Sequence, residues 1–377
     1  MTSFSYMVLI LSAMLLLRIP KSTTGSCGDR LSISGTFYKV KRTFEDVYGE
    51  GHDVEYTGYL GRTTPSERNV YVHDCVFIDC SSESDGGALC CEMVSNLLVE
   101  QSSFISCRTS SEMGGGIFYN GDMGGACVLN KICGFNCTTY SGDYSSKGMF
   151  AVVQTQHRGS KLNHVNDSTI THTSIQSVKE SLFALYLSEG KILCPSVNIT
   201  NNECYNYPAL FISTMSTDTC CISYNSIVNN SANGGFGCIE FSVYPYCIID
   251  TCNVLNNKQT DTSGHGTIYM EKGNLNIKDS CILGNNKGGK VFYQPDYSSG
   301  EITISNCTID DDIFSETRYH GTVKIVKTLE ITFINALTHI VTQSCDSYFD
   351  SYGTLTVIPT PDRTPVETPD RTPVETP

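Results

Sequence analysis

Residues 226–235 read SIVNNSANGG, in which two apolar residues precede an asparagine pair and a glycine pair closes the stretch. Related stretches recur when short apolar strands are aligned on the residue three positions before an Asn, Cys or Asp. Successive matches are 26 to 35 residues apart. The aligned residues are Phe77, Phe104, Phe135, Ile170, Ile199, Ile227, Val254, Leu283 and Ile309. A recurring period indicates a repeat architecture, whose units bury apolar faces against one another.

Glycine pairs form a second recurring signal between these strands. They begin at Gly86, Gly114, Gly234 and Gly288, and each leads into another short apolar strand. No segment shows a sustained helical period, and the strands are rich in β-branched and aromatic residues. A sandwich or barrel does not require one residue type at every period, whereas stacked coils do. The sequence therefore predicts an all-β fold, a right-handed single-stranded parallel β-helix of about nine coils.

The stacking assigns a role to each recurring slot. The aligned apolar residues are expected to be interior rungs, and Asn202, Asn230, Asn257 and Asn286 are expected to form a corner ladder. Asparagine tolerates left-handed backbone, and its amide can bond to the asparagines above and below. The glycine pairs are expected at a second corner, where backbone approaches closely.

Cysteines occupy two of these slots. Cys80 and Cys107 replace asparagine at the corner in the first two coils. They are disulfide candidates, because a spacing of about 4.8 Å between stacked strands falls within the Cα range of disulfides. Two residues before the rungs, Cys252, Cys281 and Cys307 fall on three successive coils. We interpret those as a ladder of buried thiols, with disulfide pairing as the alternative.

The ends of the chain differ from its middle. Residues 1–25 are expected to be a signal peptide, because the apolar run 7–17 is shorter than the ~20 residues of a membrane span. A buried core segment is the alternative. Residues 26–69 are assigned to an N-terminal cap and 70–358 to the β-helix with its C-terminal cap. Residues 359–377 repeat TPDRTPVE, which predicts a disordered, extended stalk.

Composition favours an extracellular protein. All 19 cysteines follow the leader, and glycosylation sequons begin at Asn136, Asn166, Asn198, Asn229 and Asn306. The net charge of −14 argues against a nucleic-acid partner, whose phosphates require a basic patch. No cofactor and no metal site is predicted. Localisation is expected to be secreted or at the cell surface.

Two stretches are candidates for parts of an active site. Gly264-His265-Gly266 resembles a polygalacturonase motif, and residues 310–312 are three aspartates. Their order along the chain is the reverse of that family's order, and its other motifs are missing. The glycines fit a corner, and the aspartates fit a solvated corner better than a Ca²⁺ site. We therefore expect no catalytic residue.

The paired motifs resemble those of the chlamydial polymorphic outer membrane protein repeat family. Gly86-Gly87-Ala88-Leu89 is similar to one half of that repeat, and Ile199-x-x-Asn202, with its relatives, is similar to the other half. Similar repeats occur in trichomonad-type parasite surface proteins. The resemblance covers about residues 70–315 and implies a surface-displayed β-helix with an adhesive or antigenic role. The C-terminal barrel of the chlamydial members has no counterpart in this sequence.

These observations predict a secreted or cell-surface adhesion or antigenic protein without catalysis. Its partner is expected to be an extracellular protein or glycan, and membrane attachment would require a segment outside this chain. The alternatives are a carbohydrate-active, pectin lyase-like enzyme and a structural spacer without a ligand.

Overall fold

The computed structural model describes residues 43–328, except for 111–112, 122–123, 140–147, 156–160, 174–182, 216–219, 235–236, 261–263, 287–288 and 311–317. The expected signal peptide (1–25), much of the N-terminal cap, the end of the C-terminal cap and the stalk (359–377) lie outside the described residues.

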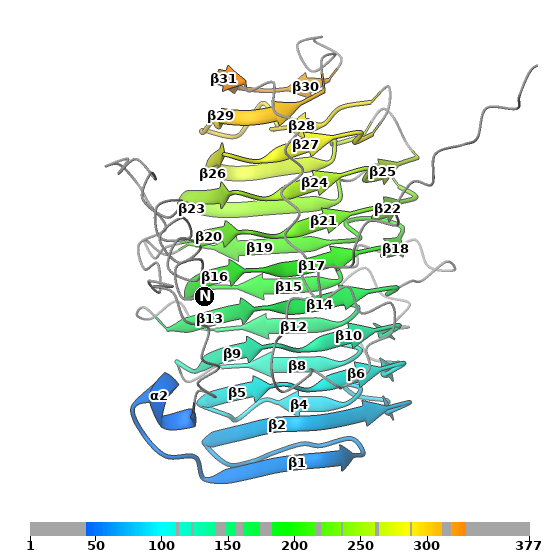
Figure 1. Ribbon diagram of the computed structural model, residues 1–377, viewed down its shortest axis with the longest axis vertical. Coiled ribbons are helices and arrows are strands. Elements are labelled where there is room, and N and C mark those ends of the chain that lie inside the picture. The colour runs from blue at the N-terminus through cyan, green and yellow to red at the C-terminus, as the bar shows by residue number, and fades with distance from the viewer. Residues whose placement is uncertain are drawn as a thin grey trace, which may run out of the picture. The chain divides into compact units, whose positions relative to one another are not determined.

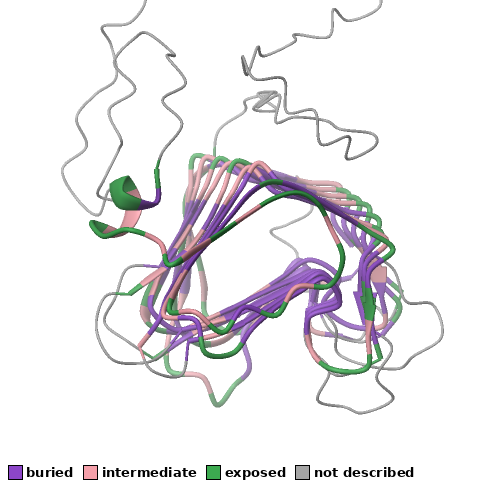
Figure 2. Ribbon diagram, turned by 90° about the horizontal axis from the view of Figure 1, so that it is seen from below, coloured by how far each residue is buried: buried purple, intermediate pink, exposed green. Residues whose placement is uncertain are grey.

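The described chain is a stack of coils whose strands pair in parallel with the strands of the coils before and after (Figure 1). The prediction of a parallel β-solenoid is therefore confirmed. Each coil contributes to three ladders of paired strands, and the longest strands pass through two of them. Viewed along the stack, successive coils superimpose on one another (Figure 2).

The first ladder contains β4 (Leu89–Cys91), β8 (Ile117–Asn120), β12 (Ala151–Gln154), β15 (Leu185–Ser188), β19 (Leu210–Thr214), β23 (Ile239–Asp250), β26 (Ile268–Lys278), β28 (Phe292–Tyr293) and β30 (Tyr319–His320). The second contains β1 (Val54–Leu60), β2 (Asn69–Ile78), β5 (Asn96–Glu100), β9 (Ala126–Asn130), β13 (Leu162–Asn166), β16 (Lys191–Pro195), β20 (Cys220–Ser223), β23, β26, β29 (Ile302–Ile309) and β31 (Val323–Thr328). The third contains β1, β2, β6 (Ser103–Ile105), β10 (Cys133–Phe135), β14 (Ser168–Thr171), β17 (Val197–Thr200), β21 (Ser226–Val228), β24 (Asn253–Leu255), β27 (Cys281–Leu283) and β29.

Shorter elements flank the ladders. Two small parallel sheets follow the third ladder: β3 (Ser81–Ser82), β7 (Arg108–Thr109) and β11 (Thr138–Thr139), then β18 (Glu203–Cys204), β22 (Ser231–Ala232) and β25 (Lys258–Gln259). A single-turn helix, α2 (Phe44–Tyr48), begins at a capping box formed by Thr43 and Asp46. Phe44 of this helix packs on outward-facing Tyr71, Leu98 and Val128, so α2 covers the outer face of the second ladder near its start.

Apolar side chains fill the interior of the solenoid. Residues at the same inward position of successive strands form a row along the stack. In the third ladder this row passes through Phe77, Phe104, Gly134, Ile170, Ile199, Ile227, Val254, Ile282 and Ile309, each paired with the next. Phe77 and Phe104 stack with their ring centroids 4.7 Å apart. Every non-glycine member of this row is at most 9% exposed.

Two of the expected rung residues are wrong by one position. Phe135 and Leu283 face outward and are half-buried, while Gly134 and Ile282 hold the inward positions. Gly134 leaves room that the side chain of Phe150 fills, since a Cβ at Gly134 would lie only 2.5 Å from the Phe150 ring. The large residue required at this level therefore comes from another part of the coil.

Each coil bends at residues with left-handed backbone. Between the second and third ladders φ lies between 46° and 60° at Asp74, Gln101, Lys131, Asp167, Ser196, Tyr224, Thr251, Asp279 and Asn306. After the third ladder φ lies between 52° and 66° at Asp79, Ser106, Asn136, His172, Asn201, Asn229, Asn256 and Gly284. Asn, Asp and Gly accept this conformation at the lowest cost, which explains their frequency at these bends.

A buried side chain follows each of these left-handed residues, and where it is Asn or Ser it accepts an N–H group from the preceding coil. After the third ladder the position is held by Cys80, Cys107, Cys137, Thr173, Asn202, Asn230, Asn257 and Asn285, which we call the corner ladder. Oδ1 of Asn230 accepts from the backbone N–H and the Nδ2 of Asn202, at 3.1 and 3.0 Å. Asn257 and Asn285 repeat this pattern towards the C-terminus. Buried N–H groups that the strand pairing leaves over are thereby satisfied.

One residue that the sequence assigns to the corner ladder is wrong. Asn286 is not a member: its amide donates to the Gln259 side chain and to the Lys290 carbonyl, and Asn285 occupies the ladder. An equivalent row at the earlier bend includes Ser102, Ser168, Asn225, Cys252 and Ser280, each accepting a backbone N–H from the coil before. Ser280, and not Cys281, therefore holds the slot expected for the thiol ladder.

The glycine pairs form a corner of close backbone contact where the structure describes them. Gly86, Gly114 and Gly148 have φ of 71°, 68° and 67°, and the first two donate to the coil that follows. Gly115 lies so close to the next coil that a Cβ would meet the carbonyl oxygens of Thr138 and Met149 at 2.2 and 2.3 Å. Gly235 and Gly288 lie outside the described residues.

Candidate functional site

The outward face of the first ladder carries a continuous row of side chains that becomes aromatic along the stack. In register, the row consists of Cys90, Phe118, Val152, Tyr186, Phe211, Glu240, Tyr269, Tyr293 and His320. Tyr186 and Phe211 stack with centroids 4.7 Å apart. Phe183 and Tyr207 pack against the middle of this row, and Met113 packs nearer its start.

The C-terminal end of the row is more open, and loop residues there widen it into an aromatic platform of His265, Tyr269, Tyr293, Tyr297 and His320. The His265 ring stacks on Tyr269 at 4.7 Å and on Tyr293 at 4.6 Å, and His320 stacks on Tyr293 at 4.8 Å. The Tyr297 hydroxyl lies 3.4 Å from that of Tyr269, while 72% of Tyr297 is exposed. Stacking covers ring faces within the platform, so its surface consists of ring edges, hydroxyls and the exposed Tyr297 ring.

Charged groups surround the platform. Nε2 of His320 lies 3.0 Å from a carboxylate oxygen of Asp296, and the Lys290 ammonium lies 5.6 Å from the centre of the Tyr293 ring. Burial, and then the nearby Lys290, lower the pKa of His265, which favours the neutral imidazole. The platform therefore combines an aromatic surface with both hydrogen-bond donors and hydrogen-bond acceptors.

Glu240 occupies the row between Phe211 and Tyr269 and is only 8% exposed. Burial among aromatic rings raises the pKa of its carboxyl to about 8, helped by the negative charge of Glu271, while a hydrogen bond from Tyr207 opposes the rise. Glu271 lies two residues beyond Tyr269 on β26 and is half-buried. Two carboxyl groups in contrasting surroundings thus adjoin the platform.

The cysteines are placed mainly in the interior. Cys220 and Cys247, on adjacent coils of the second ladder, form a disulfide with Cα atoms 4.7 Å apart. Cys133 and Cys221 each take part in a disulfide as well. The sequence-based candidates Cys80 and Cys107 are thiols, and they lie on adjacent coils of the corner ladder. The sequence does not single out the Cys220–Cys247 pair, although the two residues are 27 positions apart, which is within the spacing of the repeat.

The five sequons lie in different surroundings. Asn136 and Asn229 are exposed at left-handed bends, with φ of 53° and 56°. Asn166 and Asn306 are half-buried. Asn198 is only 6% exposed and lies between Thr169 and Ser226 on neighbouring strands. The fold does not leave room for a glycan on Asn198, which corrects its assignment as a glycosylation site.

We expect site-resolved mass spectrometry of protein secreted from eukaryotic cells to find glycans on Asn136 and Asn229 and none on Asn198. The fold covers the Asn198 side chain, so chains that carry a glycan there should fail to fold and should not be secreted. An Asn198→Gln variant that secretes like the wild type serves as the control. Substantial occupancy of Asn198 in folded protein would contradict this placement.

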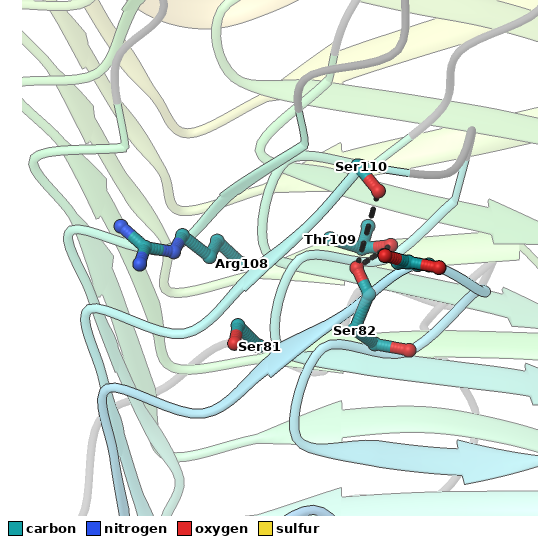
Figure 3. A pocket seen from close by; sticks show the side chains of 6 residues that line it. Ser81, Ser82, Arg108, Thr109 and Ser110 are labelled. Carbon is teal, nitrogen blue, oxygen red and sulfur yellow. Dashed lines mark hydrogen bonds between the residues drawn. The ribbon is translucent and has the colours of Figure 1, made fainter.

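A shallow depression of about 580 Å³ lies over the small sheet β3–β7–β11. Its lining includes Ser82, Thr109 and Ser110, and Figure 3 shows Arg108 pointing away from these hydroxyls. The hydroxyls of Thr109 and Ser110 already donate to the Ser82 carbonyl, at 3.3 and 3.5 Å. Because its polar groups satisfy one another, this depression is a weaker candidate than the platform.

The two candidate active-site stretches lie beside different ladders. His265 belongs to the platform beside the first ladder. Asp310 follows the third ladder, where its carboxylate accepts the N–H of Gly284 at 2.9 Å. Asp311 and Asp312 lie outside the described residues. Asp310 therefore has a structural role at a bend.

Comparison of the chain with protein-family models, with curated proteins and with solved structures gave no match. Among the described residues, no helix has the length and apolar character needed to cross a membrane.

Proposed function

We propose that the protein is a secreted or cell-surface β-solenoid that binds an extracellular glycan through its aromatic platform and acts in adhesion without catalysis. The observation that carries this proposal is the platform itself, an exposed tyrosine beside stacked Tyr and His rings. Sugar rings present an apolar C–H face that packs on aromatic rings, and their hydroxyls bond to carboxylates, imidazoles and phenols at the edge.

The surrounding charges narrow the class of glycan. Glu271 and Asp296 lie beside the platform, and the chain carries a net charge of −14. Like charges repel at close range, so sulfated and sialylated glycans are disfavoured. Neutral oligosaccharides are therefore the expected ligands. The leader-like N-terminus and the sequons in the sequence support an extracellular setting.

We expect the purified protein to bind neutral oligosaccharides on a glycan microarray, and Tyr297→Ala to weaken that binding about tenfold. The loss corresponds to about 1.4 kcal/mol, within the range of a ring-stacking contact. Tyr59→Ala is the matched control, because Tyr59 is also highly exposed, at 81%, but lies on β1 at the other end of the stack.

Absence of glycan binding, or equal binding by the Tyr297→Ala variant, would overturn the proposal. Binding of choline in place of a glycan would identify a cation–π site for quaternary amines.

A carbohydrate-active enzyme is the second candidate, favoured by the two carboxyl groups in contrasting surroundings. Glycosidases pair a neutral carboxylic acid with an ionised carboxylate across the bond they cleave. Release of new reducing ends from a bound glycan, lost in Glu240→Gln while binding persists, would favour this function over adhesion alone.

A further inference from the structure

The first three positions of the corner ladder place three thiols in one column. Strand pairing puts Arg108 beside Ser81 and beside Thr138, so the preceding residues Cys80, Cys107 and Cys137 stand on three successive coils. All three are buried, and only Cys80 retains slight exposure, at 7%. They occupy the position that asparagine holds at the other end of the ladder.

The three sulfurs interact in series. The Cys107 thiol raises the pKa of Cys80, and the Cys137 thiol raises the pKa of Cys107. The Cys107 and Cys137 thiols also lie 3.5 and 3.4 Å from the carbonyl oxygens of Phe77 and Phe104 on the preceding coil. The register places Cys107 between the other two cysteines, one on each adjacent coil.

An inward pair elsewhere in the same solenoid shows that such a stack can be bridged. Cys220 and Cys247 stand on adjacent coils, 27 residues apart, and form a disulfide. Cys80 and Cys107 are also 27 residues apart, and Cys107 and Cys137 are 30 apart. Stacked Cα atoms on adjacent coils lie about 4.8 Å apart, whereas Cys80 and Cys137 are two coils apart at about 9.6 Å, beyond the range of a disulfide.

We propose that Cys80, Cys107 and Cys137, which are all thiols in this structure, form a thiol–disulfide exchange site. On oxidation the site holds one disulfide and one thiol, with Cys107 bridged to either neighbour. A small disulfide such as oxidised glutathione enters at Cys80, the most accessible of the three sulfurs. The Cys80 thiolate forms a mixed disulfide and releases one glutathione thiolate. Attack by the Cys107 thiolate on the Cys80 sulfur then releases the second, so two protein thiols are oxidised and one glutathione disulfide is reduced.

The bridge then moves along the column without further oxidation. The Cys137 thiolate attacks the Cys107 sulfur and displaces the Cys80 thiolate, which takes up a proton. Exchange requires the attacking sulfur opposite the leaving sulfur, and a column along the stack supplies that alignment. The neighbouring Cys137 thiol and burial raise the pKa of Cys107, although Cys80 opposes the rise, so thiolate is scarce and exchange is slow at neutral pH.

Disulfide mapping of the full-length protein tests this site. The protein is incubated with oxidised glutathione, unfolded in iodoacetamide without reductant, digested and analysed by mass spectrometry. In the wild type we expect Cys107 to resist alkylation and both the Cys80–Cys107 and the Cys107–Cys137 peptides to be present. Cys137→Ser should form only the first bridge, and Cys80→Ser, which lacks the sulfur at which glutathione enters, should form neither bridge during the incubation. Cys107→Ser should raise the alkylated thiols of the column from one to two.

Serine is a suitable replacement because Thr173 already places a hydroxyl at the next position of the ladder, where it bonds to Asn202. The wild-type map decides the matter even if a variant is not secreted. Alkylation of Cys107 in the oxidised wild type, or a bridge from Cys107 to a cysteine outside the column, would overturn the site. One exclusive bridge that survives incubation at pH 9 would refute the exchange.

Discussion

Replacing Asn230 with leucine is expected to lower the stability of the solenoid by about 3 kcal/mol or more. The Asn230 side chain is fully buried and makes four hydrogen bonds. Its removal leaves the N–H and Nδ2 groups of Asn202, the Ile199 carbonyl and the Asn257 Oδ1 without this partner. Each buried group left unpaired costs about 1–3 kcal/mol. The measurement is the midpoint of thermal and urea unfolding.

The neighbouring Asn229 provides the control. Asn229 is exposed and adopts left-handed backbone with φ of 56°, which aspartate also accepts. Asn229→Asp should change stability by less than about 0.5 kcal/mol, although it removes the sequon. Equal effects of Asn229→Asp and Asn230→Leu would show that the corner ladder contributes no more than the exposed bend.

Replacing Gly115 with alanine is expected to prevent the N-terminal coils from stacking. The new Cβ would lie 2.2 Å from the Thr138 oxygen and 2.3 Å from the Met149 oxygen, and both are backbone atoms. Backbone cannot move aside as a flexible side chain can, so the coils must separate and lose their hydrogen bonds. We expect a loss of about 4 kcal/mol or more, seen as failure of secretion or a much lower unfolding temperature.

Gly61→Ala is the matched control for this substitution. A Cβ at Gly61 has no neighbour within 4 Å, and its backbone is not left-handed. Alanine at Gly61 should be neutral or slightly stabilising, because it restricts the unfolded chain. Normal secretion and stability of Gly115→Ala would mean that the coils are not packed as closely as described.

The sequence predicts the stack well because its physical requirements repeat. Every coil needs an inward apolar residue and a polar residue three positions later, and the chain repeats both. The errors in the interior rungs arise where two neighbouring residues are both plausible, because the alternation of inward and outward side chains does not show which of the two faces inward. Ile282 and Leu283 are both apolar, and the left-handed bend decides between them: Gly284 takes it, which makes Asn285 the ladder residue. Asn136 at the bend likewise places Gly134, and not Phe135, inside.

The structure separates two roles that the sequence pattern assigns to one asparagine. The pattern predicts that a single residue supplies both the left-handed backbone and the stacked amide. Asn229 supplies the first and Asn230 the second, so an asparagine pair serves one bend. Asn230 takes the second role because the N–H of Asn202 on the preceding coil needs an acceptor, and the sequence pattern does not show this.

The aromatic platform could be predicted only in part. Tyr269 and Tyr293 occupy outward positions of regular strands, but the row changes residue type from coil to coil and includes Glu240. His265 and Tyr297 come from outside the strands. The sequence places His265 in a glycine corner because Gly264 and Gly266 flank it. Its stacking on Tyr293, which is far along the chain, has no signal in the sequence. The available sequence signal for the platform is that most of the apolar strands after the glycine pairs contain aromatic residues.

The bonds between the asparagine side chains of the corner ladder all point in one direction. From Asn202 to Asn257, each described amide donates to the side-chain oxygen of the ladder residue in the coil that follows it, while its other N–H donates to a backbone carbonyl of the coil before. A coil is thus completed by residues that a ribosome has yet to add. A nascent chain emerging N-terminus first carries one incomplete coil at its growing tip, and each new repeat closes that tip and opens the next.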